Sequence, residues 1–222
     1  MTAFGVLFDL DGVLVDSASL HLRAYEQVFE SAGLAFSDAA KDAVRRGKSR
    51  AEVLNLALPM AERGLKEKLA EAKPHALRAV LQEHADCSMP GAVETVRALD
   101  RAGIPMAVVT NSRTPEIWLE KLGISQRIRV VVTGSDVSSP KPSAEGYLLG
   151  AKRLGLLPAD CLAIEDSCDG WTAARTAGMQ VAVVAKERPV WMDADTQLMP
   201  RLDSATILGL AMGQSGRSPV GG

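Results

Sequence analysis

Five short apolar runs recur along the chain, and none of them alternates with polar residues. They are rich in Val, Ile and Leu, which is typical of strands that are buried on both faces of a sheet. The runs are Phe4–Phe8, Pro105–Val109, Val130–Val132, Cys161–Ile164 and Val181–Val184. We therefore predict five strands of a sheet that is covered on both sides.

Segments with helical periodicity separate the last four runs and precede the second one. The predicted helices are Ala92–Arg101, Pro115–Leu122, Ala144–Leu154 and Gly170–Ala177. Glycines follow them where helices should end, at Gly103, Gly123, Gly155 and Gly178. Strands that alternate with helices predict an α/β fold with a parallel sheet and helices on both faces.

The first gap breaks this alternation. Between Asp16 and about residue 86 the pattern is helical throughout, for example at Leu20, Ala24 and Val28. About 70 residues is too long for a simple crossover. We predict a core domain from residues 1–16 and 86–212, a helical domain at 17–85, and a disordered tail at 213–222, which is rich in Gly and Ser.

Composition narrows the class of protein. The chain has 222 residues, 47% hydrophobic and 23% charged, which is typical of a soluble globular protein. A net charge of -2 gives no reason to expect nucleic acid as a partner, and no run approaches the roughly 20 apolar residues of a membrane span. The three cysteines form no Cys-x-x-Cys pair, so we expect a cytoplasmic protein with reduced thiols. The sequence leaves the oligomeric state open, and a monomer is compatible with it.

Polar residues gather at the carboxyl ends of the predicted strands. These ends of parallel strands lie at one edge of a sheet, where ligands bind. The segments that follow the runs are Asp9-Leu10-Asp11-Gly12, Thr110-Asn111-Ser112, Lys141-Pro142 and Glu165-Asp166. Four distant parts of the chain are thus predicted to bring carboxylates, hydroxyls and an ammonium group together.

Each segment alone has a simpler interpretation, since Asp-Gly is a common turn and hydroxyl side chains cap helices. Stability gives no reason to crowd Asp9, Asp11, Glu165 and Asp166 together, because like charges repel at close range. A divalent cation would offset that repulsion, and oxygen ligands suit Mg²⁺. We predict a magnesium site formed by these four residues.

The same groups predict phosphoryl transfer. A carboxylate can attack phosphorus to form an aspartyl-phosphate, and a second carboxylate two residues on can protonate the leaving oxygen. A cation and a nearby lysine would spread the charge of the transferring group.

With these blocks in place, the chain resembles the haloacid dehalogenase superfamily, in its β-phosphoglucomutase- and phosphatase-like branch with a helical cap. The resemblance covers about residues 4–200. The matching blocks are Phe8-Asp9-Leu10-Asp11-Gly12-Val13-Leu14-Val15-Asp16-Ser17, Val109-Thr110-Asn111-Ser112, Lys141-Pro142, and Ile164-Glu165-Asp166-Ser167 followed by Gly170.

The resemblance implies a Rossmann-like, doubly wound parallel sheet with an inserted α-helical cap that closes over the substrate. It implies that Asp9 is the nucleophile and a magnesium ligand. Asp11 would be the general acid and base, with its carbonyl on the metal. Lys141 would neutralise charge on the nucleophile and the phosphoryl group. Dehalogenases of the superfamily lack a residue like Asp11, which argues against that activity here.

The remaining blocks have implied roles as well. Thr110 and Asn111 would bind the phosphoryl oxygens, with Ser112 beside them. Asp166 would complete the metal site, with Glu165 binding the metal directly or through water. The implied substrate is a small phosphorylated metabolite.

Two residues of the helical segment leave hydrolase and mutase both open. His21 is similar to a histidine that engages the acid/base aspartate in β-phosphoglucomutases, and Arg50 to an arginine that binds a sugar's second phosphate. Surface positions are the simpler interpretation of both. We favour a phosphomonoester hydrolase, with a sugar phosphomutase as the alternative and a binding protein that has lost catalysis as a remote one.

Overall fold

The computed structural model describes residues 4–83, 86–112 and 115–214. The chain divides into two compact units, one of residues 1–15 and 88–222 and one of residues 16–87. We call them the α/β unit and the helical unit, and each is described by itself.

The α/β unit is built on a parallel sheet with the strand order β3-β2-β1-β4-β5-β6. Its strands are β1 (Gly5–Phe8), β2 (Met106–Val109), β3 (Val130–Val132), β4 (Cys161–Glu165), β5 (Gln180–Val184) and β6 (Gln197–Met199). The five predicted strands are confirmed, although Glu165 lies within β4 rather than after it. Strand β6, at the edge, was not predicted.

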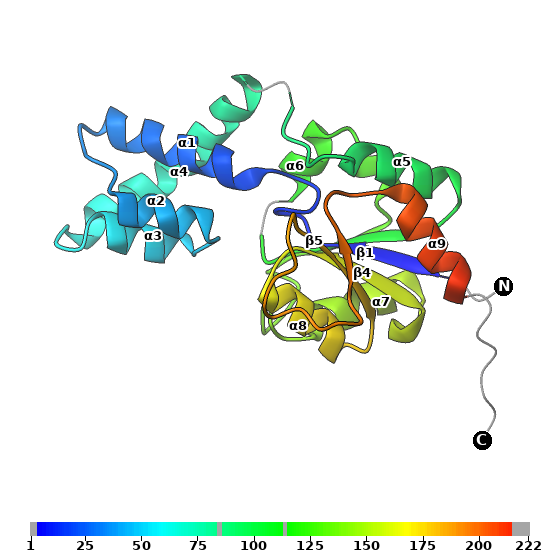
Figure 1. The fold of residues 1–222 in the computed structure, drawn as a ribbon. Helices are drawn as coiled ribbons and strands as arrows, with labels where there is room; N and C mark the ends of the chain where they lie inside the picture. Colours follow the sequence, from blue (N-terminus) through cyan, green and yellow to red (C-terminus); the bar gives the residue numbers. More distant parts are fainter. Residues whose placement is uncertain (1–3, 84–85, 113–114, 215–222) are drawn as a thin grey trace. The chain divides into compact units, whose positions relative to one another are not determined.

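Helices cover both faces of this sheet, which confirms the predicted fold class. Figure 1 shows α7 and α8 on one face and α5 and α9 on the other. The helices are α5 (Ala92–Arg101), α6 (Glu116–Lys121), α7 (Glu145–Leu154), α8 (Cys168–Thr176) and α9 (Ser204–Gln214), with short 3₁₀ turns at Ser125–Arg127 and Pro158–Asp160. Between α7 and the sheet lie fully buried side chains such as Leu7 and Tyr147.

Helix α9 has no counterpart among the predicted elements. It extends to Gln214, past Gly213, where the sequence predicts disorder to begin. The rest of the predicted tail, 215–222, lies outside the described residues.

The helical unit contains α1 (Ser17–Ser31), α2 (Asp38–Arg45), α3 (Arg50–Ala57) and α4 (Arg63–Glu83). Leu20, Ala24 and Val28 are buried on one face of α1, as their spacing indicates. Aromatic rings close the core beside them: the centroids of Phe29 and Phe36 lie 4.7 Å apart. This unit therefore has a hydrophobic core of its own.

The chain leaves the α/β unit and returns to it along adjacent segments. Val15 and Ser88 form an antiparallel bridge, and the Met89 N–H donates to the Leu14 carbonyl at 3.0 Å. At the start of the helical unit, the Asp16 N–H donates to the Cys87 carbonyl at 3.0 Å. The two junctions therefore lie next to each other.

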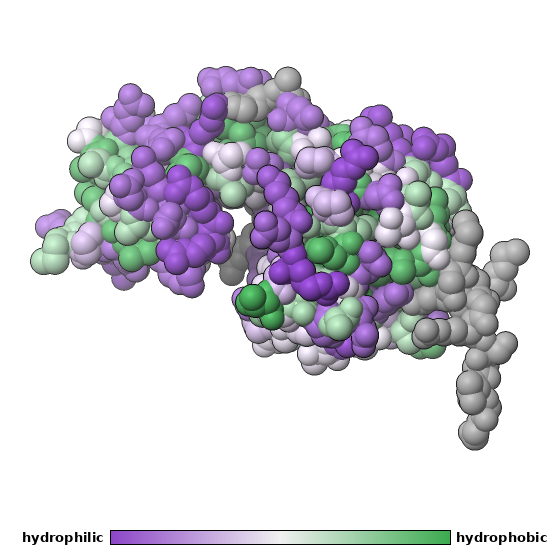
Figure 2. Space-filling model, in the orientation of Figure 1, coloured by the Kyte–Doolittle hydropathy of each residue, from purple (hydrophilic) through white to green (hydrophobic). Residues whose placement is uncertain are grey.

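The surface is mainly hydrophilic on the face that Figure 2 shows, with hydrophobic residues in small separate areas. Singly exposed apolar side chains of this kind are normal. Within the described ranges, every helix is too short or too polar to cross a membrane.

Candidate active site

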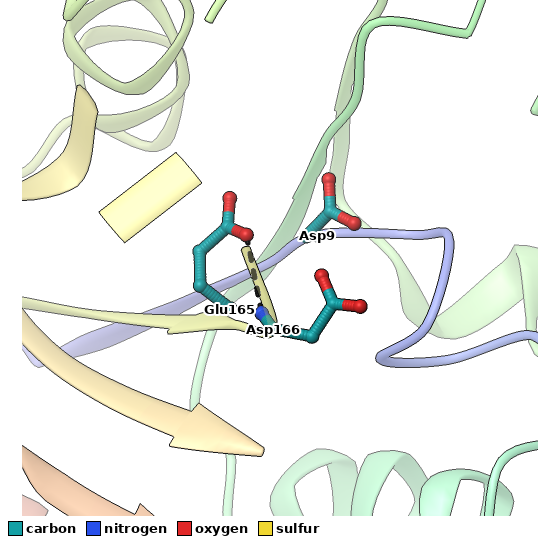
Figure 3. A group of neighbouring side chains, drawn as sticks. All are labelled: Asp9, Glu165 and Asp166. Atoms are coloured by element: carbon teal, nitrogen blue, oxygen red, sulfur yellow. Dashed lines mark hydrogen bonds between the residues drawn. The ribbon is translucent and has the colours of Figure 1, made fainter. Parts of the chain in front are cut away.

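Three carboxylates meet at the carboxyl ends of β1 and β4. Asp9 directly follows β1, Glu165 ends β4, and Asp166 comes next. Their ligand oxygens lie within 4.8 Å of one another (Figure 3). The Asp9 N–H donates to the Ile164 carbonyl at 2.9 Å, which ties the first residue after β1 to the neighbouring strand. The sheet edge thus brings together residues that are more than 150 positions apart, as the sequence predicts.

The turn after Asp9 leaves room for Asp166. Gly12 has a φ of 82°, and a Cβ built on it would lie 2.0 Å from Asp166 Oδ2. Any side chain at position 12 would therefore both strain the backbone and displace the carboxylate. Asp11 lies in the same turn, close enough for its charge to raise the pKa of Asp9 and Asp166.

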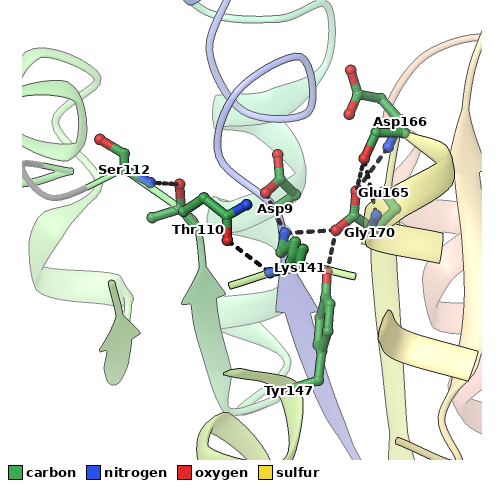
Figure 4. A network of polar contacts seen from close by, with 10 residues as sticks. Asp9, Thr110, Ser112, Lys141, Tyr147, Glu165, Asp166 and Gly170 are labelled. Carbon is green, nitrogen blue, oxygen red and sulfur yellow. Dashed lines mark hydrogen bonds and ion pairs between the residues drawn. The ribbon is translucent and has the colours of Figure 1, made fainter. Parts of the chain in front are cut away.

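Lys141 bridges two of the carboxylates from a loop far away in the sequence. Its Nζ donates to Asp9 Oδ1 at 2.5 Å and to Glu165 Oε1 at 2.6 Å (Figure 4). Its backbone N–H donates to Asn111 Oδ1 at 3.1 Å, so Asn111 helps to fix the loop. Burial alone would lower the pKa of Lys141, but the charges of Asp9 and Glu165 outweigh burial and raise it. The lysine therefore stays charged.

Negative charge accumulates around Asp9 despite this lysine. Burial raises the pKa of Asp9 well above its usual value; Lys141 opposes the shift, and Glu165, Asp11 and Asp166 add to it. Burial, and then the charge of Glu165, raise the pKa of Asp166 to about 7. A bound divalent cation would offset the repulsion among these carboxylates.

The donor set fits magnesium. The clustered atoms of Asp9, Glu165 and Asp166 are all carboxylate oxygens, the ligands that this hard cation prefers. The role of each residue as a metal ligand stays a prediction.

Glu165 is fully buried and accepts hydrogen bonds on both oxygens. Oε1 accepts from Lys141 Nζ and, at 2.6 Å, from the Tyr147 hydroxyl. Oε2 accepts from the Asp166 N–H and the Ser167 hydroxyl, both at 3.3 Å. A Cβ on Gly170 would lie 2.0 Å from this carboxylate, so the first turn of α8 leaves space for it. The protein thus holds Glu165 in one position.

Tyr147 is a member of this network that the sequence analysis missed. It is completely buried on α7, where its ring packs as an ordinary core aromatic. The only signal in the sequence is general: a buried tyrosine hydroxyl needs a hydrogen-bond partner. No pattern in the neighbouring sequence identifies Glu165 as that partner, because Glu165 lies 18 residues away.

The loop after β2 is held by its own hydrogen bonds. The buried Thr110 accepts from the Ser112 N–H at 3.0 Å through its hydroxyl, and its own N–H donates to the Val132 carbonyl at 2.9 Å. Thr110 and Ser112 thus lie at the same sheet edge as Asp9 (Figure 4), and the side chain of Asn111 contacts the backbone of Lys141. Their predicted contacts with a phosphoryl group stay predictions.

His21 and Arg50 belong to the helical unit and lie near each other there. Lys73 Nζ lies 2.7 Å from His21 Nδ1 and 5.5 Å from the centroid of the Tyr25 ring. Burial, and then the positive charges of Lys73 and Arg50, lower the pKa of His21 to about 3, which keeps the imidazole neutral. Burial raises the pKa of Tyr25 to about 12, with Arg50 opposing the shift.

Lys73 was also missed by the sequence analysis, although it leaves a signal. It lies between Leu69 and Leu77 at four-residue spacing, on the buried face of α4. A lysine at such a position is unusual, because burying an ammonium group is costly. A function or a specific partner is therefore expected for it.

The sequence of this chain is similar to those of known hydrolases. A family model described as a haloacid dehalogenase-like hydrolase matches residues 5–178. Hexitol phosphatase A of Escherichia coli is 33% identical, over 94% of this chain and 91% of that protein.

Two solved structures share the fold. A variant of CbbY from Rhodobacter sphaeroides, in complex with xylulose-(1,5)bisphosphate, is 25% identical with a TM-score of 0.74, covering 90% of this chain and 95% of that one. A β-phosphoglucomutase from Clostridium difficile has the same TM-score at 22% identity, covering 97% of this chain and 100% of that one.

Proposed function

Because the chain belongs to the haloacid dehalogenase-like hydrolases, we propose that it is a magnesium-dependent phosphatase of a small phosphorylated metabolite, a sugar or polyol phosphate. The observation that carries the proposal is the position of Asp9, which is held by Lys141 beside Asp166 at the carboxyl edge of the sheet. The sugar phosphate follows from the relatives: one is named a hexitol phosphatase, and another binds xylulose-(1,5)bisphosphate.

In the first step Asp9 is the nucleophile. Its carboxylate forms a bond to phosphorus while the bond from phosphorus to the substrate oxygen breaks. Asp11 gives its proton to that leaving oxygen, and the free alcohol departs. Lys141 stabilises the charge that spreads over Asp9 and the transferring group.

In the second step Asp11 takes a proton from water. The water oxygen bonds to phosphorus, the bond to Asp9 breaks, and inorganic phosphate leaves. Thr110, Asn111 and Ser112 would bind the phosphoryl oxygens during both steps. Asp9 and Asp166, with Asp11 and Glu165 beside them, would hold magnesium, which would supply positive charge that offsets the carboxylates and the phosphoryl group.

The test is release of phosphate from a panel of sugar, polyol and carboxylic acid phosphates with magnesium present. We expect activity from the wild type and a loss of at least about a thousandfold in Asp9→Asn, since the nucleophile is gone. Asp195→Asn, an exposed aspartate in the same unit, is the matched control and should retain full activity. If neither the wild type nor Asp9→Asn releases phosphate from any compound of the panel, the proposal is refuted.

A sugar phosphomutase is the second candidate, and the cationic cluster of the helical unit favours it. Arg50, Lys73 and His21 would suit a second phosphate on a bisphosphorylated intermediate. A mutase would interconvert sugar 1- and 6-phosphates faster when a sugar bisphosphate is added. Release of free phosphate with no isomer would exclude this candidate.

A further inference from the structure

Helix α4 contains a proline well inside its length. The helix spans Arg63–Glu83, and Pro74 lies at its centre. Proline has no N–H, so residue 74 cannot donate to the carbonyl four residues earlier, that of Ala70. The hydrogen-bond ladder of α4 is therefore interrupted at this carbonyl.

Arg50 supplies a donor at this interruption. Its Nη1 donates to the Ala70 carbonyl at 3.1 Å, across 20 positions of sequence. Arg50 is the first residue of α3, and a capping box sets that start: Ser49 accepts from the Glu52 N–H while the Glu52 carboxylate accepts from the Ser49 N–H. The guanidinium is thus held at its tip by α4, while its backbone is held by the cap of α3.

The interruption lies beside the cationic cluster. Lys73 immediately precedes Pro74 and is buried against His21 and Tyr25. The positive charge of Arg50 is close enough to act on the pKa of His21 and of Tyr25. A guanidinium has five N–H donors, and the bond to Ala70 uses one of them.

We propose that Pro74 is a positioning residue: by leaving the Ala70 carbonyl open, it anchors Arg50 beside Lys73 and His21 for recognition of the substrate. The inference rests on the proposed function. Arg50 and Lys73 would bind an anionic or hydroxyl-rich part of the substrate, apart from the phosphoryl group that is transferred. Pro74 would then set the affinity for that part without touching it.

The variant Pro74→Ala tests this directly. It restores an N–H that competes with Arg50 for the Ala70 carbonyl and releases the guanidinium. For the best substrate of the panel we expect KM to rise about threefold to tenfold, as for loss of one hydrogen bond, with kcat unchanged. His75→Ala, at the next and exposed position of α4, is the matched control and should leave KM as in the wild type.

A double-mutant cycle separates positioning from a general effect on the helix. Arg50→Gln should also raise KM, and Pro74→Ala combined with Arg50→Gln should have the KM of Arg50→Gln alone. Additive effects would overturn the inference. An unchanged KM in Pro74→Ala would also overturn it, whether or not Arg50→Gln raises KM.

Urea unfolding gives a second readout that needs no activity. Arg50→Gln should lower the unfolding midpoint in the wild-type background and leave it unchanged in the Pro74→Ala background. If Arg50→Gln shifts the midpoint only in the wild-type background and the wild type releases no phosphate, the anchoring of Arg50 by Pro74 is supported and the proposed function is refuted. Equal shifts in both backgrounds would refute the anchor, whatever the enzyme does.

Discussion

The two units treat buried charge in opposite ways. In the α/β unit, Lys141 lies between Asp9 and Glu165, and the opposite charges raise its pKa. In the helical unit, Lys73 lies against a neutral imidazole and an aromatic ring, and its charge helps to lower the pKa of His21 to about 3. One lysine is held between two carboxylates, whereas the charge of the other acts on a neighbouring imidazole.

This difference matches two tasks. A site that attacks phosphorus needs a nucleophile and a cation in fixed relative positions, and a network of ion pairs holds them there. A site that selects an anionic or polar group needs positively charged hydrogen-bond donors. We therefore propose that the chemistry and the choice of substrate can be altered separately.

The largest effect should come from Lys141→Met. Without the ammonium group of Lys141, the carboxylates of Asp9 and Glu165 stay buried with no positive partner. This should cost about 3–5 kcal/mol of stability and about a thousandfold or more in activity. Urea unfolding and phosphate release measure the two effects. Lys152→Met, at an exposed position of α7, is the matched control and should behave as the wild type. A small loss in Lys141→Met would show that the ion pairs do not hold the site together.

Magnesium should stabilise the α/β unit through Asp166. At 100 times its dissociation constant, a bound ion adds about 2.7 kcal/mol to the free energy of unfolding, which raises the melting temperature. Asp166→Asn should lose most of this response, while Asp169→Asn, three positions on and exposed, should keep it. An identical response in Asp166→Asn and the wild type would place the ion elsewhere.

A smaller effect is expected from Tyr147→Phe. The change removes one donor from the buried carboxylate of Glu165, which should cost about 1–2 kcal/mol of stability. Because Glu165 then holds Lys141 less firmly, kcat should fall about threefold to tenfold with KM little changed. The same substitution in the other unit, Tyr25→Phe, should leave kcat at the wild-type value. A fall in stability with kcat intact would make Tyr147 a packing residue only.

The smallest effect concerns His21. Its pKa in the folded protein is about 3, below the 6.5 of an unfolded chain, so the unfolded state binds more protons between these values. The stability that the neutral His21 contributes is therefore fully present above pH 6.5 and is lost as the pH falls towards 3. Between pH 7.5 and pH 6 the loss should be about 0.8 kcal/mol. Other groups such as Asp166 titrate in the same range, so the measure is a comparison. From pH 7.5 to pH 6 the free energy of unfolding should fall by about 0.8 kcal/mol more in the wild type than in His21→Asn; an equal change in both would contradict the prediction.

Much of the α/β unit can be predicted from the sequence because its signals are local. Each central strand is a continuous apolar run. The end of the run therefore predicts where the polar side chains of the site begin. Strand β6 was missed because its three residues include the exposed Gln197, whereas the equally short β3 is a run of three valines. Such a short edge strand is defined by its pairing with β5, which no local pattern reveals.

The network around Asp9 could be predicted only in part. Asp9, Thr110, Lys141 and Asp166 follow from their positions after strands or in the loop beyond them, and the structure brings them to one edge. Tyr147 could not be foreseen, because its role depends on a partner that the fold brings near. Lys73 could have been found from its place on an apolar helix face, but His21 is 52 residues away.

The two junctions at Val15 and Ser88 are adjacent, so the helical unit is inserted into the α/β unit at a single point. Its two ends meet across one β-bridge, so a segment of another length or origin can be spliced in there without pulling the sheet apart. Exchange of the segment between these two points would therefore leave the sheet and the residues at its carboxyl edge unchanged. A laboratory chimaera joined at the same two points would follow the same route.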